Sequence, residues 1–328
     1  MLTFAQFGAG RIGRIHAGNI AAHPSARLKY VVDVNADAAA TLAAQRGAEV
    51  ADVEAALVDP EVTAVMVASS TDTHADLIES SARAGKAIFC EKPIDLDSVR
   101  VETCLAVVAS TGVPLMLGFN RRFDPTFAAL RKRLRAGEVG EVEQVVITSR
   151  DPGPPPIDYI KVSGGLFRDM MIHDLDIARW LLGEEPARIF ATGACLVDPA
   201  IGAAGDIDTA TVVLTTKRGT QAVITNSRRA AYGYDQRVEV LGSRGMLQVG
   251  NRTETAILAA TADAVSTDKP MHFFLERYAE AYRIELDAFI GAVAEGRAPD
   301  PGGEDGRMAL RLADAALESL KSGAPVDL

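Results

Sequence analysis

One glycine-rich motif near the amino end constrains the fold of this chain more than any other feature. Residues 2–7 are typical of a short strand and the residues up to about 22 of a helix, and between them lies Gly8-Ala9-Gly10-Arg11-Ile12-Gly13. In a strand–turn–helix setting the first glycine permits a tight turn, the second lets the backbone approach a pyrophosphate, and the third lets helix and strand pack closely. We predict a dinucleotide site, with a purely structural turn as the alternative. Its binding residues are Gly8, Gly10, Arg11, Ile12 and Gly13.

The next predicted strand bears on the choice of dinucleotide. It covers residues 28–34 and contains Asp33, which lies twenty residues beyond Gly13. An acidic residue at this spacing accepts hydrogen bonds from the ribose hydroxyls of the adenosine. A 2′-phosphate would instead meet a carboxylate, and Asn35 offers it no positive charge. The sequence therefore favours NAD over NADP, with a simple turn aspartate as the alternative.

Helical and strand patterns alternate through the first third of the chain. The apolar run at residues 62–68 is typical of a buried strand, and further strands are predicted at residues 86–90 and 114–118. Helices are predicted at residues 36–45, 53–57, 75–84 and 98–110. This alternation predicts a parallel sheet with helices on both faces.

Small hydroxyl side chains follow the strand at residues 62–68, at the end where α/β sheets bind ligands. They suit the phosphate and ribose groups of a cofactor. The alternative is a helix cap, because Thr73 and Asp76 have the spacing of a capping box, and both interpretations can hold together. A histidine at the end of this segment is expected to be structural or to face the cofactor. The predicted cofactor residues here are Ser69, Ser70, Thr71 and His74.

A lysine follows the predicted strand at residues 86–90. Lys92 stands between Glu91 and Pro93, and the proline restricts the backbone of the residue before it. An ammonium group at this edge of a sheet can donate a hydrogen bond to a substrate hydroxyl and stabilise the developing alkoxide. We predict this role for Lys92, with a surface lysine paired to Glu91 as the alternative.

A second stretch, residues 163–182, is predicted to form a helix that begins after two glycines and ends at Gly183. It is apolar nearly all round except for a narrow polar line. Asp169, His173 and Asp176 are spaced by four and three residues, which places them on one face of an α-helix. A carboxylate can hold one nitrogen of an imidazole and raise the basicity of the other, so this line is a candidate acid–base unit. The alternative is the solvated face of an amphipathic helix.

Composition excludes several classes of partner. The chain has 328 residues, enough for about two domains, and a net charge of −10. An acidic surface argues against nucleic acid and anionic membranes as partners, and no apolar run is long enough to span a bilayer. The three cysteines are scattered and form neither a disulfide framework nor a metal-ligand cluster, so we expect a cytoplasmic protein without a metal site.

The pattern changes in the second half of the chain. Strands are predicted at residues 187–197, 208–215, 219–228, 234–241 and 245–249, with short connections. Short connections favour antiparallel meander pairing, with one face of the sheet against helices and the other free to pack on another subunit. A strand at residues 142–149 and helices at residues 125–136, 274–295 and 307–321 complete the prediction.

Four motifs taken together resemble one family of proteins. They are the glycine-rich motif at residues 8–13, EKP at 91–93, GFNRRFD at 118–124 and DMMIHD at 169–174. In combination they are similar to the glucose–fructose oxidoreductase and inositol dehydrogenase family of NAD(P)-dependent sugar and cyclitol dehydrogenases. The likeness runs nearly end to end. The sequence is further similar to the bacterial inositol 2-dehydrogenase branch, in stretches that include CEKPIDLD, GFNRRFDPTF and SRRAAYGYDQRVEV.

The resemblance implies a fold class and a domain division. It implies an α/β protein with an NAD-binding Rossmann domain at residues 1–120 and a substrate-binding domain at residues 121–328. The second domain would contain a large open, mainly antiparallel sheet and would mediate oligomerisation. A homotetramer and a cis bond before Pro93 are also implied.

The resemblance also implies roles for individual residues. From the residues alone, Arg121 and Arg122 could donate to polyol hydroxyls or to the cofactor, and pairing with Asp124 explains them equally well. Met171 departs from the family pattern, in which a smaller or hydroxyl residue is expected. The implied catalytic set is Lys92, Asp169 and His173, the implied polyol pocket is Arg122, Asp176 and Tyr232, and Glu91 and Lys92 join the cofactor residues.

The implied reaction is the NAD-dependent oxidation of a ring hydroxyl of a cyclitol, with myo-inositol giving 2-keto-myo-inositol. His173 would take the hydroxyl proton, Lys92 would hold the oxygen, and Asp169 would pair with either of them and set their protonation, without a metal. Scyllo-inositol, chiro-inositol and pyranose sugars are alternative substrates, because they present similar hydroxyl rims. A non-catalytic NAD-binding regulator is the alternative from another class, but such a protein is expected to lose one of these three residues.

Overall fold

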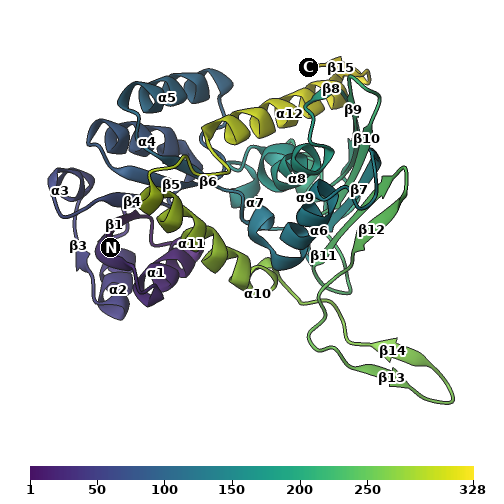
Figure 1. Ribbon diagram of the computed structural model, residues 1–328, viewed down its shortest axis with the longest axis horizontal. Helices are drawn as coiled ribbons and strands as arrows, with labels where there is room; N and C mark the ends of the chain where they lie inside the picture. The colour runs from purple at the N-terminus through teal and green to yellow at the C-terminus, as the bar shows by residue number, and fades with distance from the viewer. The chain divides into compact units, whose positions relative to one another are not determined.

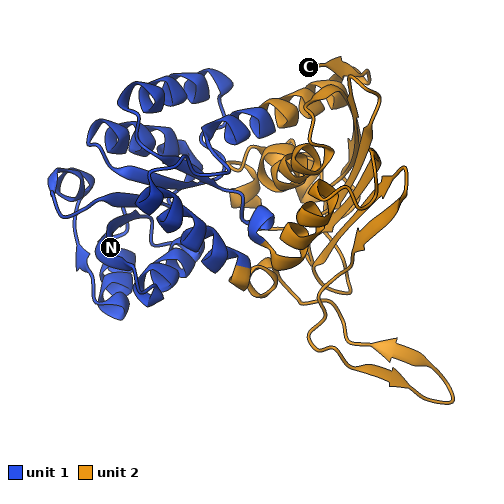
Figure 2. Cartoon of the chain, viewed as in Figure 1, with its two compact units in different colours: residues 1–123, 281–310 blue, residues 124–280, 311–328 orange.

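The computed structural model describes residues 1–328, which form two compact units (Figure 2). Unit 1 comprises residues 1–123 and 281–310, and unit 2 comprises residues 124–280 and 311–328. Each unit is therefore built from two separate stretches of the chain. No helix in either unit combines the length and the apolar character needed to cross a lipid bilayer.

Unit 1 contains a six-stranded parallel sheet with the strand order β3-β2-β1-β4-β5-β6 (Figure 1). Helices join successive strands, as the alternating pattern predicts. The strand order reverses between β1 and β4, and sheets of this kind bind ligands in the crevice at that point. The strands are β1 (Leu2–Phe7), β2 (Ala26–Val32), β3 (Glu49–Val50), β4 (Ala64–Val67), β5 (Ala87–Glu91) and β6 (Leu115–Gly118). The helices are α1 (Arg11–Ala22), α2 (Ala36–Arg46), α3 (Val53–Val58), α4 (His74–Arg83), α5 (Ser98–Thr111) and most of α11 (Ala279–Glu295), with the short turns η1 (Thr71–Thr73) and η2 (Asn120–Phe123).

The core of unit 1 explains why its strands are continuous apolar runs. All four residues of β4 are buried, since helices cover both faces of a parallel sheet. Phe4, Met66 and Phe89 of the sheet pack in one cluster with Leu42 and Phe289 of the helices, and each is at most 1% exposed. Burial of each such side chain stabilises the fold by about 1.5–3 kcal/mol.

Unit 2 contains a seven-stranded mixed sheet with the order β12-β11-β7-β10-β9-β8-β15 (Figure 1). The consecutive strands β8, β9 and β10 pair antiparallel, as their short connections predict. The predicted meander is wrong at the next step, because β10 pairs parallel with β7, and β7 lies between β10 and β11. Connection length favours pairing of neighbours in sequence but does not exclude an earlier strand from that position. The strands are β7 (Val142–Arg150), β8 (Pro186–Ala194), β9 (Thr209–Thr216), β10 (Gln221–Ser227), β11 (Asp235–Gly242), β12 (Gly245–Val249) and β15 (Val326–Asp327).

Helix α8 (Ile172–Leu182) packs against this sheet. Its Leu175 and Leu181 are at most 1% exposed and share a core with Val145 of β7 and Ile224 of β10. Gly183 ends the helix with a φ of 67°, a conformation that glycine adopts without strain, so the predicted helix end is confirmed. The other helices of unit 2 are α6 (Pro125–Arg135), α7 (Ile157–Ile160), α9 (Pro199–Ala203), α10 (Phe274–Arg277) and the part of α12 (Gly303–Ser322) from residue 311 onward.

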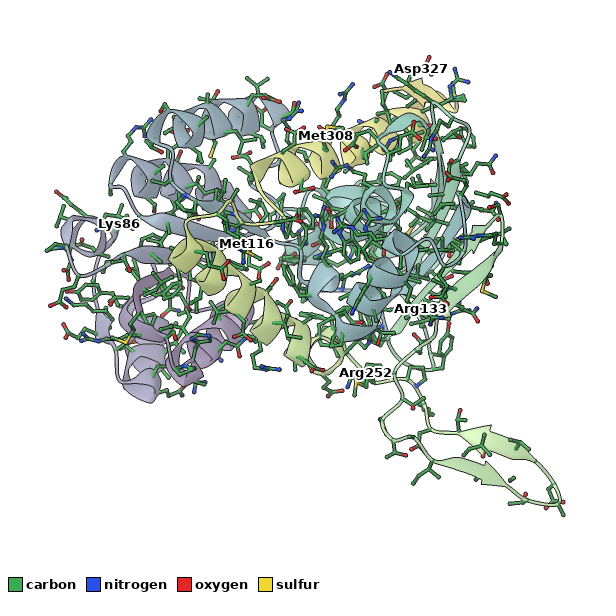
Figure 3. All side chains as sticks on the ribbon, in the orientation of Figure 1. Lys86, Met116, Arg133, Arg252, Met308 and Asp327 are labelled. Atoms are coloured by element: carbon green, nitrogen blue, oxygen red, sulfur yellow. The ribbon has the colours of Figure 1, made fainter.

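A divided helix and a hairpin in this half of the chain differ from the prediction. The predicted helix at residues 274–295 is two helices, α10 and α11, which Tyr278 separates. A hairpin of β13 (Leu258–Ala260) and β14 (Val265–Thr267) projects from the end of β12, and all six strand residues are exposed (Figures 1 and 3). Strands this short show no periodic pattern in the sequence.

Candidate active site

The glycine-rich loop after β1 has the geometry that a dinucleotide requires. Gly8 has a φ of 106°, and a Cβ there would lie 2.3 Å from the carbonyl oxygen of Ala68. A Cβ on Gly13 would lie 2.2 Å from the carbonyl oxygen of Gly8, so no larger residue fits between helix and strand. At Gly10, by contrast, an added Cβ would meet nothing within 4 Å. The loop is therefore packed on its protein side and open where a pyrophosphate would approach.

The first turn of α1 is suited to hold an anion. Gly10 is the N-cap residue and has no side chain to cap the first N–H groups, and the turn contains no acidic residue. The backbone N–H groups and the helix dipole therefore favour a phosphate at this end. In the same turn Arg11 is exposed and Ile12 is half-buried.

Gln6, which no motif singles out, holds this loop in place. Its Nε2 group donates hydrogen bonds to the carbonyl oxygens of Gly8 and Gly13, at 2.9 and 2.7 Å. The side chain is fully buried in β1. Its detectable signal is an amide side chain inside a mostly apolar strand, because a buried amide needs partners.

Asp33 lies one residue beyond β2 and contacts the same loop. Its Oδ2 accepts a hydrogen bond from Ala9 N at 2.6 Å, and its Oδ1 accepts one from Asn35 N at 2.8 Å. A carboxylate oxygen has a second lone pair, so these bonds leave acceptor capacity for ribose hydroxyls. The geometry thus combines a turn aspartate with an acceptor beside the glycine-rich loop.

The hydroxyl side chains after β4 bond to one another. Ser69 Oγ donates to Thr73 Oγ1 at 2.7 Å, and Thr73 Oγ1 donates to the carbonyl oxygen of Ser70 at 2.8 Å. Thr73 makes no capping bond to α4, so the predicted capping box is wrong. Ser70 is exposed and Thr71 is half-buried, at the edge of the sheet where the strand order reverses.

His74 links this turn to the segment after Lys92. Its Nδ1 lies 2.8 Å from the carbonyl oxygen of Pro93, and its Nε2 lies 3.2 Å from that of Ser69. Burial lowers the pKa of His74 below its ordinary value of 6.5, so the neutral ring carries one N–H near pH 7. The shorter contact assigns that proton to Nδ1. His74 therefore positions the backbone that follows the predicted catalytic lysine.

Lys92 follows directly on β5, which ends at Glu91. The lysine is half-buried, and its peptide bond to Pro93 is cis, as the resemblance implies. The Glu91 side chain points into unit 1: its Oε1 lies 2.6 Å from His16 Nε2, and its Oε2 lies 2.8 Å from the position of a Cβ added to Gly118. A contact from Glu91 to a cofactor would therefore come from its main chain.

In unit 2 a π-helix precedes α8. Residues Phe167–Met171 are wound in this form, which adds a residue to the turn and often occurs at functional sites. Asp169 lies in the π-helix, and His173 lies in the first turn of α8. The predicted regular α-helix is therefore wrong at Asp169, and the wider turn changes the angle between the two side chains.

Asp169 is held by two donors that no motif predicts. Tyr159 OH donates to its Oδ1 at 2.8 Å, and Arg228 Nη2 donates to its Oδ2 at 3.2 Å. Arg228 is only 1% exposed, and its Nη2 also lies 4.0 Å from Oδ2 of Asp206. Oδ1 of Asp206 in turn accepts a hydrogen bond from Leu166 N, just before the π-helix. A buried guanidinium needs carboxylate partners, so this cluster fixes the position of Asp169.

The sheet presents a row of polar side chains towards the start of α8. Gln236 of β11, Ser149 of β7 and Asn226 of β10 are adjacent in register, and each is at most 2% exposed. Gln236 Nε2 donates to Ser149 Oγ at 2.9 Å, and Asn226 Nδ2 donates to Asp174 Oδ2 at 3.0 Å. The apolar core thus gives way to hydrogen-bonding groups at this end of the sheet, which suits a ligand rich in hydroxyl groups.

Strand alternation is the signal that identifies Arg228 from the sequence. Along β10, Ala222, Ile224 and Asn226 are buried, whereas the residues between them are less so. A period of two places Arg228 on the same inward face. An arginine at an inward position needs an acidic partner, which here is Asp169.

The two predicted pocket residues of unit 2 have different surroundings. Asp176 is 1% exposed, and Arg179 Nη1 lies 4.0 Å from its Oδ1. The alternative interpretation of this helix face as solvated is therefore wrong for Asp176. Tyr232 is 42% exposed. Its OH donates to Asp235 Oδ2 at 2.6 Å and accepts from Arg150 Nη1 at 2.8 Å.

The third predicted pocket residue, Arg122, is held by acidic groups of unit 1. Its Nη1 lies 2.9 Å from Asp300 Oδ1, and its Nη2 lies 2.7 Å from Asp305 Oδ1. Asp124, the partner that the sequence suggests, caps the first turn of α6 and forms a buried ion pair with Arg277. A contact between Arg122 and a substrate stays a prediction.

Comparisons with known proteins identify the family of both units. The NAD-binding Rossmann fold of the GFO/IDH/MocA oxidoreductase family matches residues 2–119, and the C-terminal domain of the same family matches residues 127–248. The inositol 2-dehydrogenase of Rhizobium meliloti is 54% identical over 320 residues, which is 97% of each chain. The crystal structure of a myo-inositol dehydrogenase from Corynebacterium glutamicum is 43% identical, with a TM-score of 0.96, and the match covers 100% of this chain and 99% of that one.

A further structure holds ligands on the same fold. It is the scyllo-inositol dehydrogenase of Lactobacillus casei with bound NAD(H) and scyllo-inositol, which is 28% identical with a TM-score of 0.92 over 100% of this chain and 99% of that one. The predicted fold class and cofactor are confirmed. The chain therefore belongs to the GFO/IDH/MocA family of oxidoreductases and contains its NAD-binding Rossmann domain.

Proposed function

We propose that this protein oxidises one ring hydroxyl of a cyclitol with NAD, and that its preferred substrate is myo-inositol. The observation that carries the proposal is that each unit contains one part of the predicted catalytic set. Lys92 stands at the carboxyl end of β5 in the NAD-binding unit, and Asp169 and His173 stand beside a polar row in unit 2. The likeness to the inositol 2-dehydrogenase of Rhizobium meliloti over 97% of its length supports the choice of inositol.

The proposed reaction moves one proton and one hydride. When bound, NAD accepts the hydride at C4 of its nicotinamide ring. Neutral His173 accepts the proton of the substrate hydroxyl, and the Lys92 ammonium donates a hydrogen bond to the same oxygen as negative charge develops there. The ring carbon loses its hydride as its double bond to oxygen forms. The products are a ketone (2-keto-myo-inositol from myo-inositol), NADH and the proton on His173.

Asp169 is proposed to act beside these two groups. Tyr159 and Arg228 each donate to one of its oxygens and so orient the carboxylate. Its proposed role is to pair with Lys92 or with His173 and to set their protonation. The remaining proposed assignments are Arg122, Asp176 and Tyr232 for the polyol, and Gly8, Gly10, Arg11, Ile12, Gly13, Asp33, Ser69, Ser70, Thr71, His74 and Glu91 for NAD.

We also propose that the protein is a cytoplasmic homotetramer with its functional division near residue 120. Its three cysteines are unpaired, and Cys90 and Cys104 are buried, which suits a reducing compartment. Phe190, Leu241 and Met246, all on strands of the sheet in unit 2, are 37%, 41% and 50% exposed, which supports packing between copies. Sedimentation equilibrium should give four chains per particle, and a monomer would exclude this assembly.

Rates of NAD reduction with a panel of polyols test the proposed substrate. We expect kcat/KM to be highest for myo-inositol and lower for scyllo-inositol, chiro-inositol, glucose and xylose. Scyllo-inositol is the main competitor, because the Lactobacillus casei structure binds it on the same fold. Faster reduction with glucose or xylose than with any inositol would identify a pyranose dehydrogenase. NAD binding without reduction by any polyol would favour a regulator.

A further inference from the structure

A buried cluster of three ionisable side chains lies in unit 1 next to Lys92 in the chain. His16 on α1, Glu91 at the end of β5 and Glu285 on α11 each place one nitrogen or oxygen within 4.8 Å of the other two. His16 and Glu285 are 0% exposed, and the side chain of Glu91 is 12% exposed. The proposed hydride transfer assigns no task to these side chains.

Two members of the cluster are paired directly. His16 Nε2 lies 2.6 Å from Glu91 Oε1, which is the distance of a strong hydrogen bond. Two ligands of one tetrahedral metal ion, each about 2.1 Å from it, would stand about 3.4 Å apart. The contact therefore indicates a shared proton between His16 and Glu91 and leaves no room for an ion between them.

Glu285 is the member with unmet hydrogen-bonding capacity. Both of its oxygens are buried, and neither has a hydrogen-bond partner. Burial, and next the negative charge of Glu91, raise the pKa of Glu285 well above its ordinary value of 4.5. A protonated carboxyl group has one O–H to donate, and acceptors of the His16–Glu91 pair lie within 4.8 Å. Donation to that pair would satisfy a group that is costly to bury alone.

The surroundings of the cluster are mostly apolar. Phe89 of β5 and Tyr282 of α11 place their rings 5.3 and 5.6 Å from the ring of His16. Strand β6 presents the backbone of Gly118 to the carboxylate of Glu91. The other charged groups of these elements are Arg11 and Arg14 of α1, Lys92 after β5, and Glu280, Arg283, Asp287 and Glu295 of α11. His23, which follows α1, forms an ion pair with Asp287.

We propose that His16, Glu91 and Glu285 form a proton-sharing unit that fixes the end of β5, and with it Lys92, against helix α1 of the NAD site. The unit ties three elements together: the helix that receives the pyrophosphate, the strand that ends before the lysine, and α11. Glu285 is a positioning residue, whose O–H holds the carboxylate of Glu91. This inference rests on the roles of Lys92 and α1 in the proposed function.

Thermal unfolding at several pH values tests the shared proton. Above pH 4.5 the unfolded chain releases the proton of Glu285 while the folded protein keeps it, so stability falls as the pH rises towards the folded pKa. Glu285→Gln keeps the neutral shape and removes this titration. We expect the melting temperature of the variant, relative to the unmodified protein, to rise by about 2 °C for each pH unit in this window. Glu295→Gln, a control on the same helix whose side chain is 63% exposed, should show no such trend.

Activity with myo-inositol tests the positioning role. The amide of Glu285→Gln donates an N–H where the acid donates an O–H, so kcat and the KM for NAD should stay within about two-fold. Glu285→Leu fills the site without a donor, and kcat should fall at least about ten-fold because Lys92 is displaced. If Glu285→Gln loses as much activity as Glu285→Leu, a charged carboxylate is needed and the proposal is wrong.

Two further outcomes would overturn the proposal. One is a melting-temperature difference between Glu285→Gln and the unmodified protein that does not change with pH. The other is a rise in the melting temperature of the unmodified protein on adding Mn²⁺ or Zn²⁺ that Glu285→Gln abolishes, since an ion would then occupy the cluster. Both measurements use the protein without substrate, so they decide this inference even if no cyclitol is oxidised and the proposed function fails.

Discussion

The two units use their sheets differently to place polar groups. In unit 1 these groups stand in short loops beyond the carboxyl ends of parallel strands, as the glycine-rich loop, Ser69 and Lys92 do. In unit 2 they stand on the inward face of a mixed sheet or on the helix that covers it, and Arg228 reaches Asp169 across 59 residues of sequence. A cofactor site can thus be specified by contiguous residues, whereas this candidate substrate site depends on distant pairs.

Replacing His173 should have the largest effect and should distinguish the role of unit 2 in turnover from the role of unit 1 in NAD binding. In His173→Ala the hydroxyl proton has no acceptor, so kcat should fall by about 10²–10⁴-fold. NAD binds through unit 1, and its Kd, measured by fluorescence titration, should change by less than about two-fold. Turnover equal to that of the unmodified protein would remove His173 from the mechanism and with it the division of labour between the units.

The two lysines that flank β5 allow a matched test within unit 1. Lys92→Met should lower kcat by about 10²–10³-fold, because the developing alkoxide loses its donor, and should leave the melting temperature nearly unchanged. Lys86 precedes the strand, is 7% exposed and donates to the carbonyl oxygens of Asp59 and Val62, both at 2.8 Å (Figure 3). Lys86→Met leaves these acceptors unsatisfied, at a cost of about 1–3 kcal/mol each, so it should lower the melting temperature and keep kcat. The reverse pattern would show that the amino end of β5, not its carboxyl end, carries the chemistry.

Arg228 and its neighbour Arg229 offer a matched pair in unit 2. Arg228 is buried against Asp169, whereas Arg229 is exposed. Lysine lacks the planar fork of arginine, so Arg228→Lys should misplace Asp169 and lower kcat by about ten-fold, with little effect on the Kd for NAD. Arg229→Lys should behave as the unmodified protein. Equal kcat in both variants would mean that the long-range pair does not support the reaction.

Cofactor choice should change by a similar factor and should depend on unit 1 alone. Asp33→Ser removes the carboxylate beside the glycine-rich loop, so the ratio of kcat/KM for NAD to that for NADP should fall by about ten-fold. Asp37→Ser, an exposed aspartate in the first turn of α2, is the control and should not change the ratio. An unchanged ratio in Asp33→Ser would exclude this residue as the determinant of cofactor choice.

Unit 1 was the easier half to predict, for a physical reason. Its glycines are required by local steric clashes; for example, a Cβ added to Gly13 would lie 2.2 Å from the carbonyl oxygen of Gly8. Its strands also alternate with helices in order along the chain. Even there Gln6 and the Glu285 cluster carry no motif, because their partners come from other elements.

Unit 2 was predicted less completely because pairing across distance decides it. Hydrophobic alternation located its main strands to within a few residues, yet it could not place β7 beside β10. The spacing of Asp169 and His173 assumed a regular α-helix, and the π-helix changes their relation. Tyr159 is in a helix of four residues, too short to recognise from periodicity, and its bond to Asp169 appears only once the chain is folded.

The π-helix at Phe167–Met171 has a consequence for how such proteins can diverge. Loss of one residue between Asp169 and His173 would restore a regular helix and reduce the spacing of these two residues from four to three. The angle between the carboxylate and the imidazole would then change while the sheet behind them stayed intact. A single-residue insertion or deletion, more than any substitution, is thus the change by which a lineage could redirect this face towards a different alcohol.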